Sequence, residues 1–168
     1  MRSYDPLYKV NPPLRSERDV QALREALADG TIDVVATDHA PHPVEDKDCE
    51  WSAGAMGMLG LETALGVVAE AMVSTGLLDW AGVADRMSHA PARIGRLEGH
   101  GRPLEAGEPA NLVLVDPEAS RTVDPRELHS RSHNTPYAGR TLPTRVVATF
   151  LRGRPTVLDG ALVEAVTA

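Results

Sequence analysis

Residues 32–36, Ile-Asp-Val-Val-Ala, form a short and largely apolar run without strict alternation between apolar and polar side chains. A strand with one face in water alternates, whereas a strand of a parallel sheet is covered on both faces and is apolar along its length. The run therefore predicts a doubly covered parallel strand at Ile32 to Ala36. Such a strand restricts the chain to folds in which helices cover a sheet, that is, to the α/β class.

Helices are predicted on both sides of this strand. Before it, a capping box of Ser16 and Asp19 starts a helix that ends at Asp29-Gly30. Its apolar positions are Val20, Leu23 and Leu27. After the strand, a helix is predicted around Leu61 to Thr75, with Leu61, Leu65, Val68 and Met72 on one stripe. Two more are expected, one capped by Asp79 and running through Met87, and a short one that Pro91 opens and that stops at Gly95.

The character of the chain changes after Gly95. Three apolar runs rich in β-branched residues follow, separated by glycines, prolines and Asp-Gly: residues 112–115, 145–150 and 156–158. We expect residues 1–95 to be the last part of an α/β domain and residues 96–168 to be part of an all-β module. A complete α/β barrel needs about 250 residues, so the chain is expected to be part of something larger.

The composition of the chain argues against two classes of binding partner. The 168 residues carry a formal net charge of −7 and contain no run of Lys or Arg, which argues against nucleic acid and against an anionic membrane surface. The single cysteine, Cys49, cannot form an intramolecular disulfide, so a cytoplasmic location is expected. No apolar stretch approaches the roughly 20 residues that span a bilayer, and residues 1–15 lack a signal-peptide core.

Polar residues follow the predicted strand directly, in the sequence ATDHAPH. Catalytic residues of α/β folds gather at the carboxyl ends of strands, and Asp38 is expected at such an end. A carboxylate there can bind a divalent metal and take up a proton. Asp38 could equally cap the next turn, with His39 exposed beside it, and the pattern alone leaves both interpretations open.

Two further stretches have a structural and a functional interpretation. In KVNPPLR, the prolines make the loop rigid, and that rigidity could fix the Asn11 amide for hydrogen bonds to a polar ligand. The glycine-rich stretch AGAMGMLG (53–60) could be a flexible hinge, or could let backbone groups approach a planar ligand closely. His89, His100, His129 and His133 show no spacing typical of metal ligands.

Together and in this order, these motifs resemble the dihydroorotases of the bacterial type I class, members of the amidohydrolase superfamily. The matching stretches are KVNPPLR, DGTIDVVATDHAPH, GMLGLETAL, HAPARIGRL, GEPANLVLVD, SHNTPYAG and RGRPTVLDG. Hydantoinases and allantoinases share the strand and its Asp-His. They tend to have another residue at the position of His42, and no Asn before Pro-Pro-Leu-Arg. Asn11 and His42 therefore favour the dihydroorotases.

The resemblance implies that residues 1–95 are the carboxyl-terminal part, the last strands and helices, of a metal-dependent (β/α)8 barrel, and that residues 96–168 are a β-rich segment of a composite β-sandwich. It also implies roles for individual residues. Asp38 matches the aspartate at the end of the eighth barrel strand, which contacts the metal centre and acts as general base and acid. His42 matches the histidine that binds the substrate's carboxylate, and Asn11 matches a substrate-binding asparagine. Met56 and Gly57 match a Phe-Gly whose backbone contacts the pyrimidine ring. The chain departs from the usual Pro-Phe-Gly by reading Ala-Met-Gly at 55–57.

The reaction implied by the resemblance is the reversible cyclisation of N-carbamoyl-L-aspartate to L-dihydroorotate in pyrimidine synthesis. A zinc-bound hydroxide attacks the ring amide carbonyl, and Asp38 passes the proton to the departing nitrogen. The family's other metal ligands, among them a His-x-His pair, belong upstream of Met1. Because a catalytic zinc usually takes three protein ligands, we expect the chain alone to be inactive.

Two other functions stay open. One is another cyclic amidohydrolase, such as a hydantoinase or dihydropyrimidinase. The other is a non-catalytic dihydroorotase-like subunit that scaffolds aspartate carbamoyltransferase; such subunits have typically lost metal-site residues, and the retained Asp38 counts against this role. A homo-oligomer is also expected.

Overall fold

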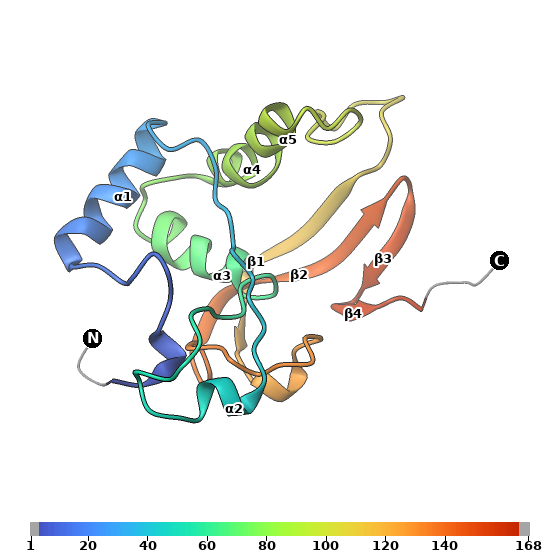
Figure 1. Cartoon of the computed structure of the whole chain (residues 1–168). Helices are drawn as coiled ribbons and strands as arrows, with labels where there is room; N and C mark the ends of the chain where they lie inside the picture. The colour runs from blue at the N-terminus through green and yellow to red at the C-terminus, as the bar shows by residue number, and fades with distance from the viewer. Residues whose placement is uncertain (1–3, 165–168) are drawn as a thin grey trace.

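The computed structural model describes residues 4–164 (Figure 1). Its helices are α1 (Glu17–Asp29), α2 (Val44–Lys47), α3 (Ala64–Val68), α4 (Trp80–Ala84) and α5 (Ala90–Gly95). Short 3-10 helices cover Pro6–Tyr8 and Pro125–Glu127, and π-helical turns cover Ala69–Val73 and Asp85–His89. The strands are β1 (Leu112–Thr122), β2 (Thr141–Leu151), β3 (Arg154–Leu158) and β4 (Ala161–Leu162). Within residues 4–164, no helix has the length and apolar character needed to cross a membrane.

The capping box predicted for the first helix is confirmed. The Ser16 hydroxyl accepts a hydrogen bond from the Asp19 amide at 3.4 Å, and the Asp19 carboxylate accepts one from the Ser16 amide at 3.1 Å. Gly30 ends α1 in the left-handed conformation with φ of 90°. The predicted apolar stripe is only partly used, since Leu27 packs against the core whereas Leu23 is exposed. The reason is the position of α1 at the outside of the molecule (Figure 1).

The prediction of a strand at Ile32 to Ala36 is wrong. These residues belong to no strand, and Asp33 and Ala36 are exposed, so the segment is not covered on both faces. A strand exists only when its backbone is hydrogen bonded to a neighbouring strand. In the described part of the chain, the Val35 amide instead donates to the Arg86 carbonyl at 3.1 Å, and a single parallel bridge joins His39 to Met58.

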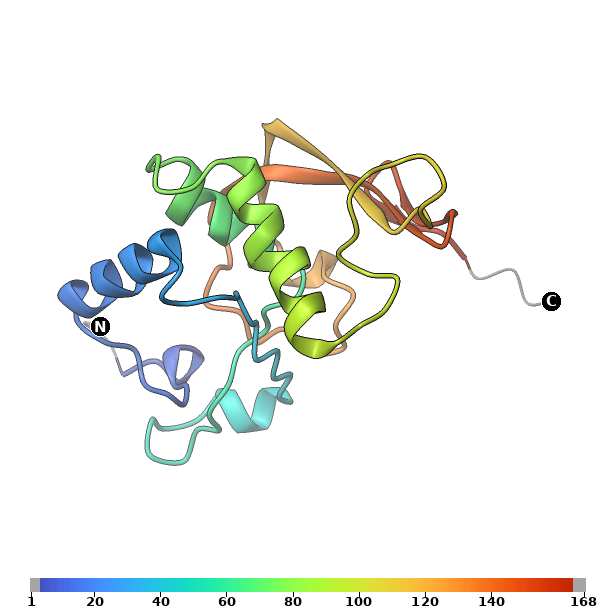
Figure 2. The same ribbon diagram turned by 90° about the horizontal axis from the view of Figure 1, so that it is seen from above.

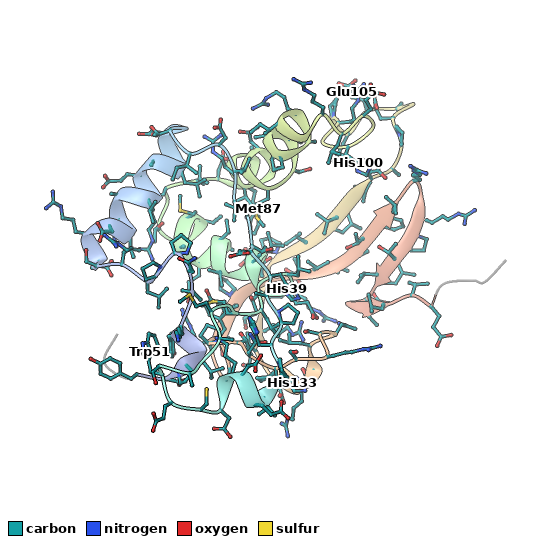
Figure 3. The ribbon with its side chains drawn as sticks, in the orientation of Figure 1. His39, Trp51, Met87, His100, Glu105 and His133 are labelled. Carbon is teal, nitrogen blue, oxygen red and sulfur yellow. The ribbon has the colours of Figure 1, made fainter. Side chains whose placement is uncertain are left out.

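The helix predicted around Leu61 to Thr75 is shorter than expected. It covers α3 and continues through the π-helical turn to Val73, while Leu61 precedes it and is exposed. Val68 and Met72 do face inward, where they form a buried cluster with Val83. Partly buried side chains surround this cluster, among them Leu27, Val35, Leu65, Trp80 and Met87, the last of which is labelled in Figure 3.

The next helices are confirmed at their outer ends, the cap at Asp79 and the stop at Gly95, but the predicted end at Met87 is wrong because helical turns continue from Trp80 to Gly95 without a break. The Asp79 carboxylate caps α4 by accepting a hydrogen bond from the Gly82 amide at 2.7 Å. The π-helical turn Asp85–His89 joins α4 to α5, whose first turn contains Pro91. Gly95 is the last residue of α5, and Arg96 follows in the left-handed conformation with φ of 53°.

The β-rich part forms one antiparallel sheet with the order β1-β2-β3-β4. The three predicted runs lie in β1, β2 and β3, although β1 and β2 extend further than predicted. Seen from above, the helices lie on one side of the molecule and the sheet on the other (Figure 2). They meet where α3 packs on β2: a Cβ added to Gly66 would lie 3.0 Å from the Leu142 Cβ.

The connection between β1 and β2, residues 123–140, runs back to the helical part and to α2 (Figure 1). Its contacts are polar and specific. The Glu62 carboxylate accepts hydrogen bonds from the His129 amide and ring at 2.8 Å each, and Arg140 pairs with Glu70 at 2.6 Å. The β-rich segment is thereby joined to the region that contains the predicted site residues.

Candidate functional site

His42 and the glycine-rich stretch are in direct contact. The His42 Nε2 lies 3.1 Å from the Met56 carbonyl oxygen. A carbonyl only accepts hydrogen bonds, so the proton must be on Nε2. The other ring nitrogen, Nδ1, lies 3.7 Å from an Asp46 carboxylate oxygen, and the His42 side chain keeps about a quarter of its surface exposed, 25%. Two of the predicted substrate-binding positions, His42 and Met56, thus lie side by side.

Gly57 permits this contact by its lack of a side chain. A Cβ at this position would lie 2.6 Å from the Ala40 Cβ and 2.9 Å from the His42 Nε2, closer than van der Waals contact allows. The backbone also adopts φ of 144°, which glycine tolerates far better than other residues. Gly57 thus permits the close approach of protein groups, whereas the approach of a planar ligand to this stretch stays a prediction.

Asn134 belongs to this group, although the sequence did not indicate any role for it. Its side-chain oxygen accepts from the His42 amide at 3.1 Å, and its side-chain nitrogen donates to the carbonyls of Ala40 at 2.9 Å and Gly57 at 3.4 Å. The residue is buried. One amide side chain thus joins the segment that carries His42 to the segment that carries Gly57. The only sequence signal was its place in the matching stretch SHNTPYAG.

The amino-terminal segment reaches the same place through its backbone. The Gly57 amide donates to the Lys9 carbonyl at 2.9 Å, and Asn11 follows two residues later, exposed to solvent. The Lys47 ammonium group, also buried, donates to carbonyls on both segments. Asn11 is therefore carried by a loop that is hydrogen bonded to Gly57.

Asp38 is exposed to solvent, and the next residue, His39, fixes the segment that carries it by hydrogen bonds. Asp38 adopts a left-handed conformation with φ of 43°, which Asp tolerates better than most residues. The next residue, His39, lies near the centre of the molecule (Figure 3), and its Nδ1 accepts hydrogen bonds from the amides of Gly60 at 3.1 Å and Leu61 at 3.3 Å. Within residues 4–164, no hydrogen bond or ion pair engages the Asp38 carboxylate.

The described residues do not form a metal centre by themselves. Asp38 is the one predicted ligand, and in residues 4–164 no three or more His, Cys, Asp or Glu side chains gather closely enough to hold a metal ion. A catalytic zinc usually takes three protein ligands. The residues that the structure describes therefore do not fit a zinc ion by themselves.

Comparisons with known proteins relate this arrangement to enzymes. The profile described as "Amidohydrolase family" matches residues 10–156. The chain is 72% identical over 162 residues to a dihydroorotase of Streptomyces coelicolor, covering 96% of this chain and 38% of that protein. It is 56% identical over 162 residues to a dihydroorotase of Mycobacterium tuberculosis, with the same two coverages, 96% and 38%. The chain thus spans about 38% of the length of these relatives.

Solved structures match at lower identity. An L-hydantoinase (dihydropyrimidinase) from Arthrobacter aurescens superposes with a TM-score of 0.88 and 32% identity over 96% of this chain and 36% of that one. A D-hydantoinase (dihydropyrimidinase) from Thermus sp. gives a TM-score of 0.85 and 30% identity over 95% of this chain and 36% of that one. In both cases the likeness extends over nearly all of this chain and about a third of the other protein.

Proposed function

The chain belongs to the amidohydrolase family, and from this premise we propose that it is part of a dihydroorotase. The predicted fold class, the end of an amidohydrolase (β/α)8 barrel followed by a β-rich segment, is confirmed by the family match and by the likeness to the two hydantoinase structures. The observation that carries the proposal is the 72% identity to a protein named dihydroorotase, set against 30% and 32% for the hydantoinases.

The arrangement of side chains supports different roles for two groups of residues, one that binds the substrate and one that transfers the proton. Asn11, His42, Met56 and Gly57 bind the substrate: the ring lies against the backbone of Met56 and Gly57, and Asn11 and His42 bind polar groups. His42 already donates from Nε2 to a neutral carbonyl oxygen. A substrate carboxylate is a stronger acceptor than a carbonyl because it is charged. It can therefore replace the Met56 carbonyl as the acceptor of the hydrogen bond from Nε2.

Asp38 moves the proton in this proposal. Its carboxylate is exposed to solvent while its neighbour His39 is held by two backbone amides. During ring opening, Asp38 accepts a proton from the attacking water and delivers it to the ring nitrogen as the amide bond breaks. During cyclisation, the same carboxylate takes the proton from the carbamoyl nitrogen as the C–N bond forms and delivers it to the carboxyl oxygen, which leaves as water when the C–O bond breaks.

Zinc is proposed as the cofactor only of a protein in which further ligands join Asp38. Bound there, the metal would lower the pKa of a water molecule and polarise the amide carbonyl. The single ligand in this chain is not enough to hold it, so no catalytic step is assigned to the metal here.

A chimera tests the proposal. In the Streptomyces coelicolor dihydroorotase, the matched segment of 162 residues would be replaced by the corresponding residues of this chain. We expect the chimera to interconvert N-carbamoyl-L-aspartate and dihydroorotate at a rate close to that of the unmodified relative, and to act poorly on hydantoin and dihydrouracil. A folded, metal-loaded chimera that prefers hydantoin or dihydrouracil would identify a hydantoinase segment, the function that the structural likeness favours.

Three expectations about the setting of the whole protein stay predictions. These are a homo-oligomer, an association with aspartate carbamoyltransferase and a cytoplasmic location. Light scattering of the chimera, alone and mixed with aspartate carbamoyltransferase, measures the first two. A chimera that lacks turnover but binds the carbamoyltransferase would favour the scaffold function instead.

A further inference from the structure

Lysine is rare in this chain. Only Lys9 and Lys47 occur among the 17 basic residues, and the other 15 are arginines (17 − 2). Both ammonium groups donate to backbone carbonyls near the candidate site: Lys9 to Trp51 and Ser52, and Lys47 to Pro6, Lys9 and Ala55. Lys47 is the buried one, with 6% of its surface exposed.

The three carbonyls around Lys47 form a cage that matches the chemistry of an ammonium group. The Lys47 Nζ lies 3.0 Å from the Pro6 oxygen, 3.3 Å from the Lys9 oxygen and 2.8 Å from the Ala55 oxygen. An ammonium group has three protons, so each can be donated to one carbonyl. A planar guanidinium group carries its donors in a fixed fork and cannot converge on three acceptors from one point. The cage therefore requires lysine, in a chain whose basic residues other than Lys9 and Lys47 are all arginines.

Carbonyl oxygens hold the Lys47 ammonium group, and within residues 4–164 no carboxylate forms an ion pair with it. Burial lowers the pKa of the Lys47 ammonium group, and the nearby positive charge of Lys9 lowers it further. A buried charge is tolerated only when it is fully hydrogen bonded. The three carbonyls therefore satisfy all three protons of the buried Lys47 ammonium group.

The carbonyls belong to the two segments that carry predicted substrate-binding residues. Pro6 and Lys9 precede Asn11, and Ala55 precedes Met56. The Lys9 carbonyl also accepts from the Gly57 amide at 2.9 Å, so it is shared between Lys47 and Gly57. Lys9 strengthens the same junction by donating to the carbonyl of Trp51, which is labelled in Figure 3, at 2.9 Å.

We propose that Lys47 is a positioning residue that fixes the Asn11 loop and the Met56–Gly57 backbone relative to one another by binding a carbonyl on each segment. The consequence for substrate rests on the proposed function: Lys47 touches no substrate and sets the distance between groups that do. Its removal should therefore weaken substrate binding and leave the Asp38 proton transfer largely intact.

The structural part of the proposal is tested on the 168-residue chain by amide hydrogen exchange. In Lys47→Met, exchange at the Gly57 amide should become roughly 10- to 100-fold faster, the factor that corresponds to losing a hydrogen bond to a charged group. The Val83 amide, bonded to the Asp79 carbonyl in α4, should keep its rate. Lys47→Arg should resemble Lys47→Met, since it keeps the charge but not the cage. Arg126→Met, which removes a charge at an exposed pair with Asp124, is the matched control and should change neither rate.

An unchanged Gly57 exchange rate in folded Lys47→Met would overturn the proposal. Should both Lys47 variants fail to fold, acetylation of the unmodified chain tests the proposal instead. Lys47 should react at least about tenfold more slowly than Lys9, because Lys47 is buried and reacts only after local opening, whereas Lys9 is partly exposed. Equal acetylation rates would overturn the proposal without any variant.

Kinetics of the chimera test the consequence for substrate. Lys47→Met should raise KM about tenfold or more while kcat changes little, as expected when binding common to ground and transition states is lost. A fall in kcat with KM unchanged would contradict a positioning role for the binding segments. If the chimera with Lys47 intact does not act on dihydroorotate, the proposed function fails, while the exchange and acetylation data still decide the role of Lys47.

Discussion

At the scale of single residues, much of the candidate site consists of side chains that hold backbone groups. His42 donates to the Met56 carbonyl, and Asn134 is bonded to backbone groups of Ala40, His42 and Gly57. Asp38, in contrast, is exposed to solvent. Substitutions at these positions should therefore have different consequences, since some affect the shape of the site and others only its chemistry.

The first prediction concerns Asp38. In the chimera, Asp38→Asn should lower kcat by roughly 10²- to 10⁴-fold, the usual contribution of general acid–base catalysis. An amide keeps the shape of the carboxylate but cannot act as a base. Steady-state kinetics give the effect, and circular dichroism checks the fold, which should be unchanged because Asp38 is exposed. A kcat close to that of the unmodified chimera, at equal metal content, would eliminate the proton transfer by Asp38.

The second prediction concerns His42. His42→Ala should raise KM and lower kcat/KM, because it removes a group that binds the substrate's carboxylate in both ground and transition states. Asp46→Asn is the matched control: its carboxylate lies 3.7 Å from the His42 Nδ1, and because this carboxylate is half exposed, the pair should contribute little. Initial rates over a range of dihydroorotate concentrations separate the two variants. An unchanged KM in His42→Ala would rule out the anchoring role.

Some residues of the site could be predicted from the sequence and others could not. Asp38 and His42 stand in the short stretch ATDHAPH, and Gly57 stands in the glycine-rich stretch 53–60, so each could be predicted from its neighbours in the sequence. Asn134 bonds to a carbonyl 94 positions away, and Lys47 bonds to one 41 positions away. Their partners are backbone oxygens, which every residue has. A sequence contains no sign of such contacts until the fold is known.

At the scale of helices and strands, local signals were reliable. The caps at Ser16 and Asp79 depend on residues within one turn, and both are confirmed. The strand at Ile32 to Ala36 was wrong because a strand depends on a neighbour that the local pattern does not describe. The position of Leu23 was missed for a related reason, since helical spacing predicts a face but not whether anything covers it.

A prediction at this scale uses the cap of α1. Ser16→Ala should lower the free energy of unfolding by about 0.5–2 kcal/mol, the typical effect of losing an N-cap side chain. It removes the hydroxyl that accepts from the Asp19 amide at 3.4 Å. Ser88→Ala, at a position in the π-helical turn Asp85–His89, is the control and should have a smaller effect. Urea unfolding followed by circular dichroism measures both, and equal stabilities would contradict the cap.

The same cap should respond to pH. Two hydrogen bonds from Ser16 to the Asp19 carboxylate hold the pKa of Asp19 below its ordinary value of 3.8. The bond from the Ser16 hydroxyl has the larger effect and the bond from the Ser16 amide the smaller one. A lowered pKa in the folded state stabilises the protein above pH 3.8, and this stabilisation is lost as the pH falls through the folded-state value. In Ser16→Ala, the pKa of Asp19 should move up toward 3.8, which carboxyl NMR titration measures. An unchanged titration would show that the Ser16 hydroxyl does not bind the Asp19 carboxylate.

At the scale of the whole molecule, the connection at 123–140 joins the two kinds of structure. Asn134 reaches the site, His129 pairs with Glu62 before α3, and Arg140 pairs with Glu70 in the π-helical turn after α3. The likeness to the two hydantoinase structures covers 95% and 96% of this chain, so the overall course of the backbone is common to the fold. The chain nevertheless spans only about 38% of the length of its dihydroorotase relatives.

The last prediction follows from the share of its relatives' length that the chain covers, about 38%. The 168-residue chain by itself should bind zinc weakly and should not turn over N-carbamoyl-L-aspartate. Its one predicted ligand is Asp38, no cluster of three or more ligand side chains lies within residues 4–164, and a catalytic zinc usually takes three protein ligands. Zinc affinity can be measured by competition with a chromophoric chelator, and turnover by the absorbance of dihydroorotate. The chimera, measured in parallel, should hold zinc and be active, and Asp38→Asn in the chimera should lower its zinc affinity. Tight zinc binding with turnover by the purified chain alone would show that its own residues assemble a complete centre.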